Sequence, residues 1–219
     1  KKKFLHIFDI YKELKDEIYK DKSIENLSFD EHRKKIIDKN FSWSLNVKDT
    51  FKDFQVIQLI SNDHILQKKW CLENKFSKSL NIENILYEQI VKENPDIIFF
   101  QNTHLLSKIV NKIRGYKFFF YDGTAENNLQ IAKQSFGVLT CLKKSMIFYQ
   151  KNNIKSLYMP HSFNKKILER VEVKNFLSRK YDLVYSGSVD NRGHFNRVIF
   201  LNKIAKNFNI RLYISDSRS

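Results

Sequence analysis

The residues with the clearest chemical character lie near the C-terminal end of the chain. There a short apolar strand leads into Gly187 and Ser188, then into a polar loop and a helix that begins near His194. Backbone N–H groups exposed at such a turn before a helix form a ready site for an anion, and Gly187 allows backbone paths closed to other residues. Arg192 and Arg197 would add guanidinium groups suited to phosphate oxygens. The pattern predicts a phosphate-binding turn, with a plain strand-to-helix connection and an Arg197 packed on the sheet as the alternative.

A second set of polar residues follows the apolar runs that are expected to form strands. In an open parallel sheet, ligands bind beyond the carboxyl ends of the strands. The residues expected at that edge are 9, 11, 61–64, 101–104, 122–126, 161 and 187–194. They include His64, His104 and His161, each of which could instead cap a helix or form a hydrogen bond within a loop. Together they predict a polar cleft along this edge.

His104 and Asp122 are the candidate catalytic residues within this set. A histidine at a strand end can stabilise charge or shuttle a proton near neutral pH. Asp122 could accept a proton from a sugar hydroxyl, although Asp122 and Gly123 would also make a simple turn. Glu126 could equally be a charge at the start of a helix. We therefore expect His104 and Asp122 to face the same cleft.

The elements that must position these residues alternate between strand and helix. Apolar runs predict strands at residues 4–10, 55–60, 97–100, 117–121, 136–141, 156–159, 182–186 and 211–214. Helical patterns occupy residues 28–39, 43–54, 62–74, 82–92, 105–113, 144–151 and 194–207. Ser28 and Glu31 have the spacing of a capping box at the start of the first of these helices.

This alternation predicts an α/β fold built on a parallel sheet. Residues 1–170 are expected to form one Rossmann-like domain, with the first four strands as parallel neighbours. Residues 171–219 are expected to be a linker and the start of a second Rossmann-like domain. A strand–helix–strand piece of that size is too small to bury both faces of its own sheet, so this second domain is expected to be incomplete.

The formal charge of +15 raises the question of a polyanionic partner. Of the 39 basic residues, 31 are lysines, and they are found along the whole chain. This pattern is more typical of a solvated surface than of a nucleic-acid footprint, which clusters on one element. Attraction to an anionic membrane surface or a polyanionic substrate is the second reading. Specific nucleic-acid binding is not expected.

Cysteine usage and hydropathy bear on the compartment. Cys71 and Cys141 lie far apart without any metal-binding spacing, as expected for two reduced thiols in a cytoplasmic protein. The apolar run after Lys1–Lys2–Lys3 is too short for a signal peptide, and no stretch approaches the length of a membrane span. The expected localisation is cytoplasmic, with peripheral attachment at the inner face of the membrane as a variant.

Several motifs of known chemistry are missing from the sequence. The P-loop, the glycine-rich dinucleotide turn, the zincin helix and the nucleophile elbow do not occur. P-loop, classical dinucleotide and zincin sites are therefore not expected, and no motif identifies a cofactor.

Four stretches, at residues 27–44, 66–73, 85–98 and 181–197, have a familiar order. They contain Leu66-Gln-Lys-Lys-Trp-Cys-Leu-Glu73, then Asn94-Pro-Asp, and Tyr-Ser-Gly-Ser188 before a His-x-x-Arg ending at Arg197. In this order they resemble bacterial GT-B glycosyltransferases related to the spore-maturation protein CgeB.

The resemblance implies two Rossmann-like domains, the first for an acceptor and the second for a nucleotide-sugar, without a bound metal. The acceptor would be a glycan, a lipid-linked molecule or a protein. Gly187, Ser188, Arg192, His194 and Arg197 would lie on the diphosphate side. Two other readings stay open: a non-catalytic Rossmann-like module whose basic surface binds nucleic acid or an anionic membrane, and a nucleotide-sugar epimerase. The common epimerases need a glycine-rich first turn, which residues 4–11 do not supply.

Overall fold

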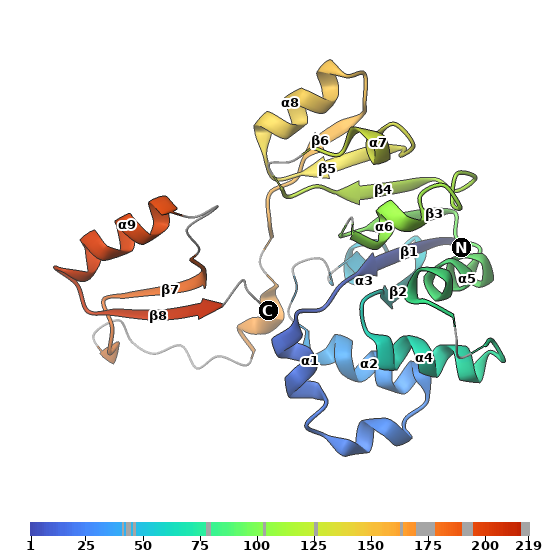
Figure 1. Ribbon diagram of the computed structural model, residues 1–219, viewed down its shortest axis with the longest axis horizontal. Coiled ribbons are helices and arrows are strands. Elements are labelled where there is room, and N and C mark those ends of the chain that lie inside the picture. Colours follow the sequence, from blue (N-terminus) through green and yellow to red (C-terminus); the bar gives the residue numbers. More distant parts are fainter. Residues whose placement is uncertain are drawn as a thin grey trace. The chain divides into compact units, whose positions relative to one another are not determined.

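The computed structural model describes residues 1–40, 42, 45, 47–77, 80–102, 104–124, 127–162, 164–169, 178–189 and 195–215. The chain divides into two compact units, Lys1–Ile167 and Leu168–Ser219. Figure 1 labels the helices and strands of both units.

The first unit is built on a six-stranded parallel sheet in the order β2-β1-β3-β4-β5-β6. Its strands are β1 (Lys2–Phe8), β2 (Phe54–Ile60), β3 (Ile97–Phe100), β4 (Phe118–Tyr121), β5 (Gly137–Thr140) and β6 (Ser156–Tyr158). The described strand pairs of this sheet are all parallel. The α/β fold class and the four neighbouring parallel strands predicted from the sequence are thus confirmed.

Helices connect successive strands. The connections contain α1 (Lys12–Ile18), η1 (Lys22–Asn26), α2 (Phe29–Lys39), α3 (Val47–Thr50), α4 (His64–Glu73), α5 (Ile82–Glu93), α6 (His104–Ile109), α7 (Leu129–Ala132) and α8 (Lys143–Lys151), and η3 (Lys165–Ile167) ends the unit. Helix α5 stops at Asn94, whose left-handed conformation (φ 44°) precedes Pro95. Among the described residues, no helix is long and apolar enough to cross a membrane.

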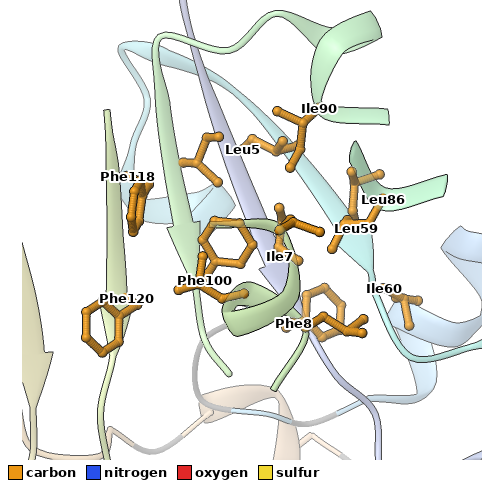
Figure 2. Packing of buried hydrophobic residues seen from close by; sticks show 14 of the residues in the cluster. Leu5, Ile7, Phe8, Leu59, Ile60, Leu86, Ile90, Phe100, Phe118 and Phe120 are labelled. Atoms are coloured by element: carbon orange, nitrogen blue, oxygen red, sulfur yellow. The ribbon is translucent and has the colours of Figure 1, made fainter. Parts of the chain in front are cut away.

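The main hydrophobic core lies between one face of the sheet and helices α4 to α8. Strand residues such as Leu5, Ile7, Phe100 and Phe120 pack there in one cluster with helix residues such as Leu86 (Figure 2). Side chains of a strand alternate between faces, so Phe4 and Phe99 belong to the opposite face, in a smaller cluster. Because both of its faces are covered, β1 is buried from Phe4 to Phe8, and His6 is the polar residue within this stretch.

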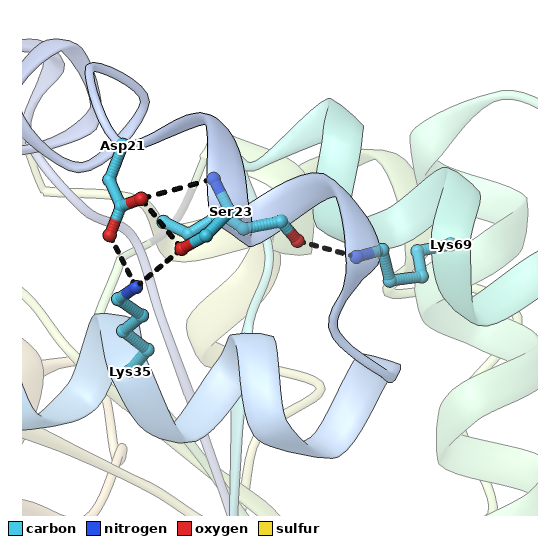
Figure 3. Close-up of polar contacts among 5 residues, drawn as sticks. Asp21, Ser23, Lys35 and Lys69 are labelled. Atoms are coloured by element: carbon cyan, nitrogen blue, oxygen red, sulfur yellow. Dashed lines mark hydrogen bonds and ion pairs between the residues drawn. The ribbon is translucent and has the colours of Figure 1, made fainter.

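The region of α1, η1 and α2 is fastened by polar contacts. Ser28 caps α2 and forms the predicted capping box with Glu31, which confirms that prediction. Lys69 of α4 donates to the backbone carbonyl oxygens of Ile24 (2.9 Å) and Leu27 (2.5 Å). Figure 3 shows one of the hydrogen bonds of Lys69 together with the Lys35–Asp21 ion pair, whose N–O distance is 2.5 Å. The ammonium of Lys69 thus joins α4 to the backbone of η1 and to the residue before the cap of α2.

One prediction of secondary structure was wrong in this unit. Among the described residues of the helix expected over residues 43–54, Val47–Thr50 form α3, residues 51–53 lie outside any helix, and Phe54 begins β2. The apolar residues there serve the second sheet face, where Phe51 stacks on Phe4 with 5.0 Å between ring centroids. Residues 12–18, for which no helix was predicted, form α1, and its Ile18 is buried.

The second unit contains β7 (Leu183–Ser188), α9 (Phe195–Ala205) and β8 (Ile210–Ser215). Strands β7 and β8 pair in parallel, including Gly187 with Ile214. The turn predicted at Gly187 and Ser188 is therefore wrong, because both residues lie within the strand ladder. A side chain at Gly187 would place its Cβ 2.9 Å from the Tyr185 hydroxyl oxygen.

Candidate functional site

The sheet order places a switch point beside β1. The connection that leaves β1 runs to β2 on one side, whereas the connection that leaves its neighbour β3 runs to β4 on the other side. In doubly wound sheets the ligand crevice lies at this point, outside the carboxyl ends of the strands. The residues that follow Phe8, Ile60 and Phe100 therefore converge at one place.

Asp9 is the centre of this convergence. Its carboxylate accepts hydrogen bonds from the Ser61 hydroxyl, which follows β2, and from Asn102 Nδ2, which follows β3, at 2.9 Å. Asp9 is half-buried, whereas Asn102 and the neighbouring Tyr11 are exposed, Tyr11 to 83%. The cluster of Asp9, Ser61 and Asn102, called the Asp9 cluster below, is thus supported from beneath and open at its rim.

The loops that carry the Asp9 cluster are fixed by backbone contacts. Asn62 forms two hydrogen bonds of 2.9 Å with the N–H and C=O of Ile10. The Asn62 side-chain amide thus pairs with the Ile10 backbone as the backbone of a neighbouring strand would. Lys15 of α1 donates to the Asn62 carbonyl oxygen at 2.8 Å. The Ser61 N–H donates to the Phe8 carbonyl oxygen at 2.9 Å. These bonds hold Asp9 and Ser61 in register and pre-organise the cluster.

A second polar group adjoins the cluster at the end of β3. Gln101 donates from Nε2 to the Ser42 hydroxyl at 3.2 Å, and Asn164 Nδ2 contacts the Ser42 carbonyl oxygen at 3.4 Å. Asn164 is only 3% exposed. Sequence reasoning placed Gln101 and Asn102 at this edge but missed Ser42 and Asn164. These two residues are 122 positions apart, and no local sequence pattern identifies them as neighbours.

His6 lies beneath the cluster, in the middle of β1. It is fully buried, stacks between Phe8 and Phe99, and has its Nδ1 3.3 Å from Gln58 Nε2. Burial lowers the pKa of His6 to about 3, against a smaller opposite effect of a hydrogen bond with Gln101. The imidazole is therefore neutral at pH 7 and serves as a polar contact within the sheet.

The candidate His104 is the first residue of α6 and is exposed. The pKa of Glu83 on α5 is lowered chiefly by a hydrogen bond from Lys108 and to a smaller extent by the charge of His104. His104 and Asp122 both follow strands at the same edge, but no hydrogen bond joins their side chains. Their joint catalytic role stays a prediction.

Asp122 is buried, and its carboxylate is occupied by the protein itself. One oxygen accepts from the Thr124 N–H (3.2 Å) and hydroxyl (2.9 Å), and the other accepts from the Tyr149 hydroxyl at 2.5 Å. The Tyr149 oxygen in turn accepts from the Asn128 N–H at 2.9 Å. Burial, and then the bond to Asp122, raise the pKa of Tyr149. This geometry fits the simple-turn alternative and makes Asp122 an anchor for the start of α7.

The other edge residues have mainly local roles. Asp63 caps α4 and accepts from the Tyr19 hydroxyl at 2.7 Å, while burial and Asp63 raise the pKa of Tyr19. His64 is exposed on α4. The His161 ring lies 5.5 Å from the Tyr121 ring, centroid to centroid.

Part of the predicted phosphate turn lies outside the described residues, which do not include Arg192 or His194. Glu126, predicted at the edge of the first sheet, also lies outside them. Ser188 ends β7, and Arg197 lies exposed in the first turn of α9, which begins at Phe195. Within the described part of the chain, no group of three His, Cys, Asp or Glu side chains could hold a metal ion. Cys71 is buried, Cys141 is half-buried, and both thiols are free.

Comparisons with known proteins give no family. No family model and no curated protein match this chain. Among solved structures it is similar to an ABC transporter solute-binding protein from Bacillus halodurans C-125 with bound myo-inositol, at 12% identity and a TM-score of 0.32. The match covers 97% of this chain but only 56% of that one, so the chain spans little more than half the length of this structure. The α/β, Rossmann-like description rests on the sheet itself.

Proposed function

We propose that this chain takes part in sugar transfer from a nucleotide-sugar, and that its first unit binds a polyhydroxylated acceptor at the Asp9 cluster. The observation that carries the proposal is the meeting of a carboxylate, a hydroxyl and an amide at the switch point of the sheet. The order of the glycosyltransferase-like stretches in the sequence supports the reaction class. The second unit would supply the donor side, through residues 187–197.

The chemistry of the Asp9 cluster suits sugar hydroxyls. Each hydroxyl both donates and accepts, and a carboxylate offers about four acceptor positions, of which the protein uses two. The Asn102 amide can donate and accept at the exposed rim. Tyr11 presents an aromatic face that could cover the C–H side of a sugar ring. A ligand with several adjacent hydroxyls would therefore find matched partners here.

In the proposed reaction, an acceptor hydroxyl oxygen forms a bond to the anomeric carbon while the bond from that carbon to the diphosphate breaks. The hydroxyl proton passes to the carboxylate of Asp9, and the nucleoside diphosphate leaves with the bonding electron pair. His104 remains a candidate for stabilising charge at the same edge. Asp122 suits the base role less well, because its oxygens already accept three hydrogen bonds.

The test is nucleoside diphosphate release from UDP- and GDP-linked sugars in the presence of saccharide acceptors. Loss of a general base typically costs about 10²–10⁴-fold in rate, so Asp9→Asn should reduce turnover by that order with little change in melting temperature. The matched control is Asp30→Asn, which changes an exposed carboxylate on α2. Full turnover in Asp9→Asn would refute the assignment of the base.

Saccharide binding distinguishes the proposal from the non-catalytic alternative. Saturation-transfer NMR with mono- and disaccharides should give a signal that Asn102→Ala weakens. Binding that depends on Asn102, without release of nucleoside diphosphate from any donor, would make this chain a carbohydrate-binding module. Absence of both would refute the proposed function altogether.

A further inference from the structure

A chain of hydrogen bonds runs from α2 through the end of α1 to the start of α4, and a buried histidine begins it. His32 of α2 is 0% exposed, and its Nε2 lies 3.2 Å from the Tyr19 hydroxyl oxygen. The Tyr19 hydroxyl donates its hydrogen to the Asp63 carboxylate at 2.7 Å. The phenol oxygen is then left as an acceptor, so His32 Nε2 carries the imidazole hydrogen and Nδ1 carries none.

The Nδ1 atom of His32 is buried and has no hydrogen-bond partner among the described residues. A proton there would create a buried N–H without an acceptor, which is costly. The charged groups that face the ring are Lys69 on α4 and Lys35 on α2, which oppose a second positive charge, and Asp63, which favours it. Burial, followed by Lys69, lowers the pKa of His32 from its ordinary 6.5. The enclosed ring therefore rejects a proton that the same ring accepts in water.

Residues 12–26, called the α1–η1 segment below, carry Tyr19 and have few buried side chains. All of these residues are described, and only Ile18 and Ile24 among them are buried. Polar contacts add to this packing, namely the hydrogen bonds of Tyr19 and the bond from Lys69 to the Ile24 carbonyl oxygen at 2.9 Å. Segments with few buried apolar contacts open locally at a lower free energy than the whole domain. The α1–η1 segment is thus able to open by itself.

The same segment is tied to the loop that carries part of the Asp9 cluster. Lys15 donates to the Asn62 carbonyl oxygen at 2.8 Å, and Tyr19 donates to Asp63 at 2.7 Å. Ser61, the hydroxyl member of the cluster, immediately precedes these two acceptors. Opening of the α1–η1 segment removes both ties to the loop that positions Ser61.

We propose that proton uptake by His32 opens the α1–η1 segment and thereby weakens binding at the Asp9 cluster, so that the site loses its ligand in acid. Opening exposes the ring to water, where Nδ1 takes up a proton, and the bound proton favours the open segment by linkage. Because the enclosed ring has the lower pKa, the closed segment is fully favoured above pH 6.5 and is progressively disfavoured as the pH falls below it. The effect on the Asp9 cluster rests on the proposed function, whereas opening of the segment does not.

The test is amide hydrogen exchange of the whole chain, followed by NMR between about pH 7 and about pH 5. The reporters are Tyr19 and Ile24, whose N–H groups donate to the carbonyl oxygens of Lys15 and Asp21. After correction for intrinsic exchange, their opening constant should rise up to about tenfold for each unit by which the pH falls below 6.5, as uptake of one proton requires. The Ile98 amide in the sheet should stay more protected at every pH, because the opening is local.

The decisive variant is His32→Gln, because the glutamine amide can donate to Tyr19 but takes up no proton. Its exchange profile should be nearly flat over this range, whereas His64→Gln, at an exposed position on α4, should follow the wild type. If His32→Gln does not fold, the imidazole signals of the wild type decide, since protonation of His32 should coincide with the loss of protection. A wild-type profile that does not depend on pH, or an equal slope in His32→Gln, would overturn the proposal.

Saccharide binding separates this inference from the proposed function. Affinity should fall with acidification more in the wild type than in His32→Gln, since titration of Asp9 affects both chains equally. Opening in acid without saccharide binding at any pH would refute the proposed function and support the opening of the segment. Saccharide binding with the same pH dependence in both chains would overturn the coupling to the Asp9 cluster.

Discussion

The buried His6 predicts how the stability of the first unit depends on pH. Its pKa is about 3 in the folded chain, against 6.5 in the absence of structure. Because the folded pKa is the lower one, the unfolded chain binds the proton more readily between these values. The stability that the neutral His6 contributes is therefore fully present above pH 6.5 and is lost as the pH falls toward 3.

The size of this effect follows from the pKa difference. Between these two pKa values, protonation of His6 should lower the free energy of unfolding by up to about 1.4 kcal/mol for each unit by which the pH falls. From pH about 6.5 to about 4, the contribution of His6 amounts to roughly 3 kcal/mol. No compensating acid contacts the ring, whose described neighbours are Phe8, Phe99, Gln58 and Gln101.

Urea denaturation of the wild type and of His6→Gln at several pH values in this window measures the contribution. His6→Gln is expected to lower stability at pH 7 through lost packing, but its pH slope should be flatter than that of the wild type. Burial also lowers the pKa of His32, which steepens both curves equally and cancels in the difference. His64→Gln, at an exposed position, should leave the slope unchanged. Parallel curves for the wild type and His6→Gln would refute the reasoning.

Two further substitutions test anchors of the fold by urea denaturation. Tyr149→Phe leaves the Asp122 carboxylate and the Asn128 N–H without their shared partner, so stability should fall by roughly 3 kcal/mol or more. Asp122→Asn, which keeps an acceptor for Tyr149, should cost less, and a Tyr149→Phe loss under about 1 kcal/mol would contradict this anchor. Ser28→Ala removes the cap of α2 and should cost about 0.5–2 kcal/mol; a change within error would mean that Lys69 alone fixes this end of the helix.

The sequence alone determined the elements whose formation is local. Strand β4 consists of aromatic residues alone, and the Ser28–Glu31 box depends on residues three apart. The α/β alternation follows from such local signals. Where local signals conflicted with tertiary needs, sequence reasoning failed: Gly187 suggested a turn, but pairing of β7 with β8 extends the strand through it.

Only the tertiary structure decided which edge residues meet. The sequence placed Asp9, Ser61, Asn102, His104 and Asp122 at one edge of the sheet and singled out His104 and Asp122 as catalytic candidates. The order β2-β1-β3 brings the first three together from 93 positions apart, while Thr124 and Tyr149 occupy the Asp122 carboxylate. Strand order is set by long-range burial of whole faces, which no window of neighbouring residues encodes.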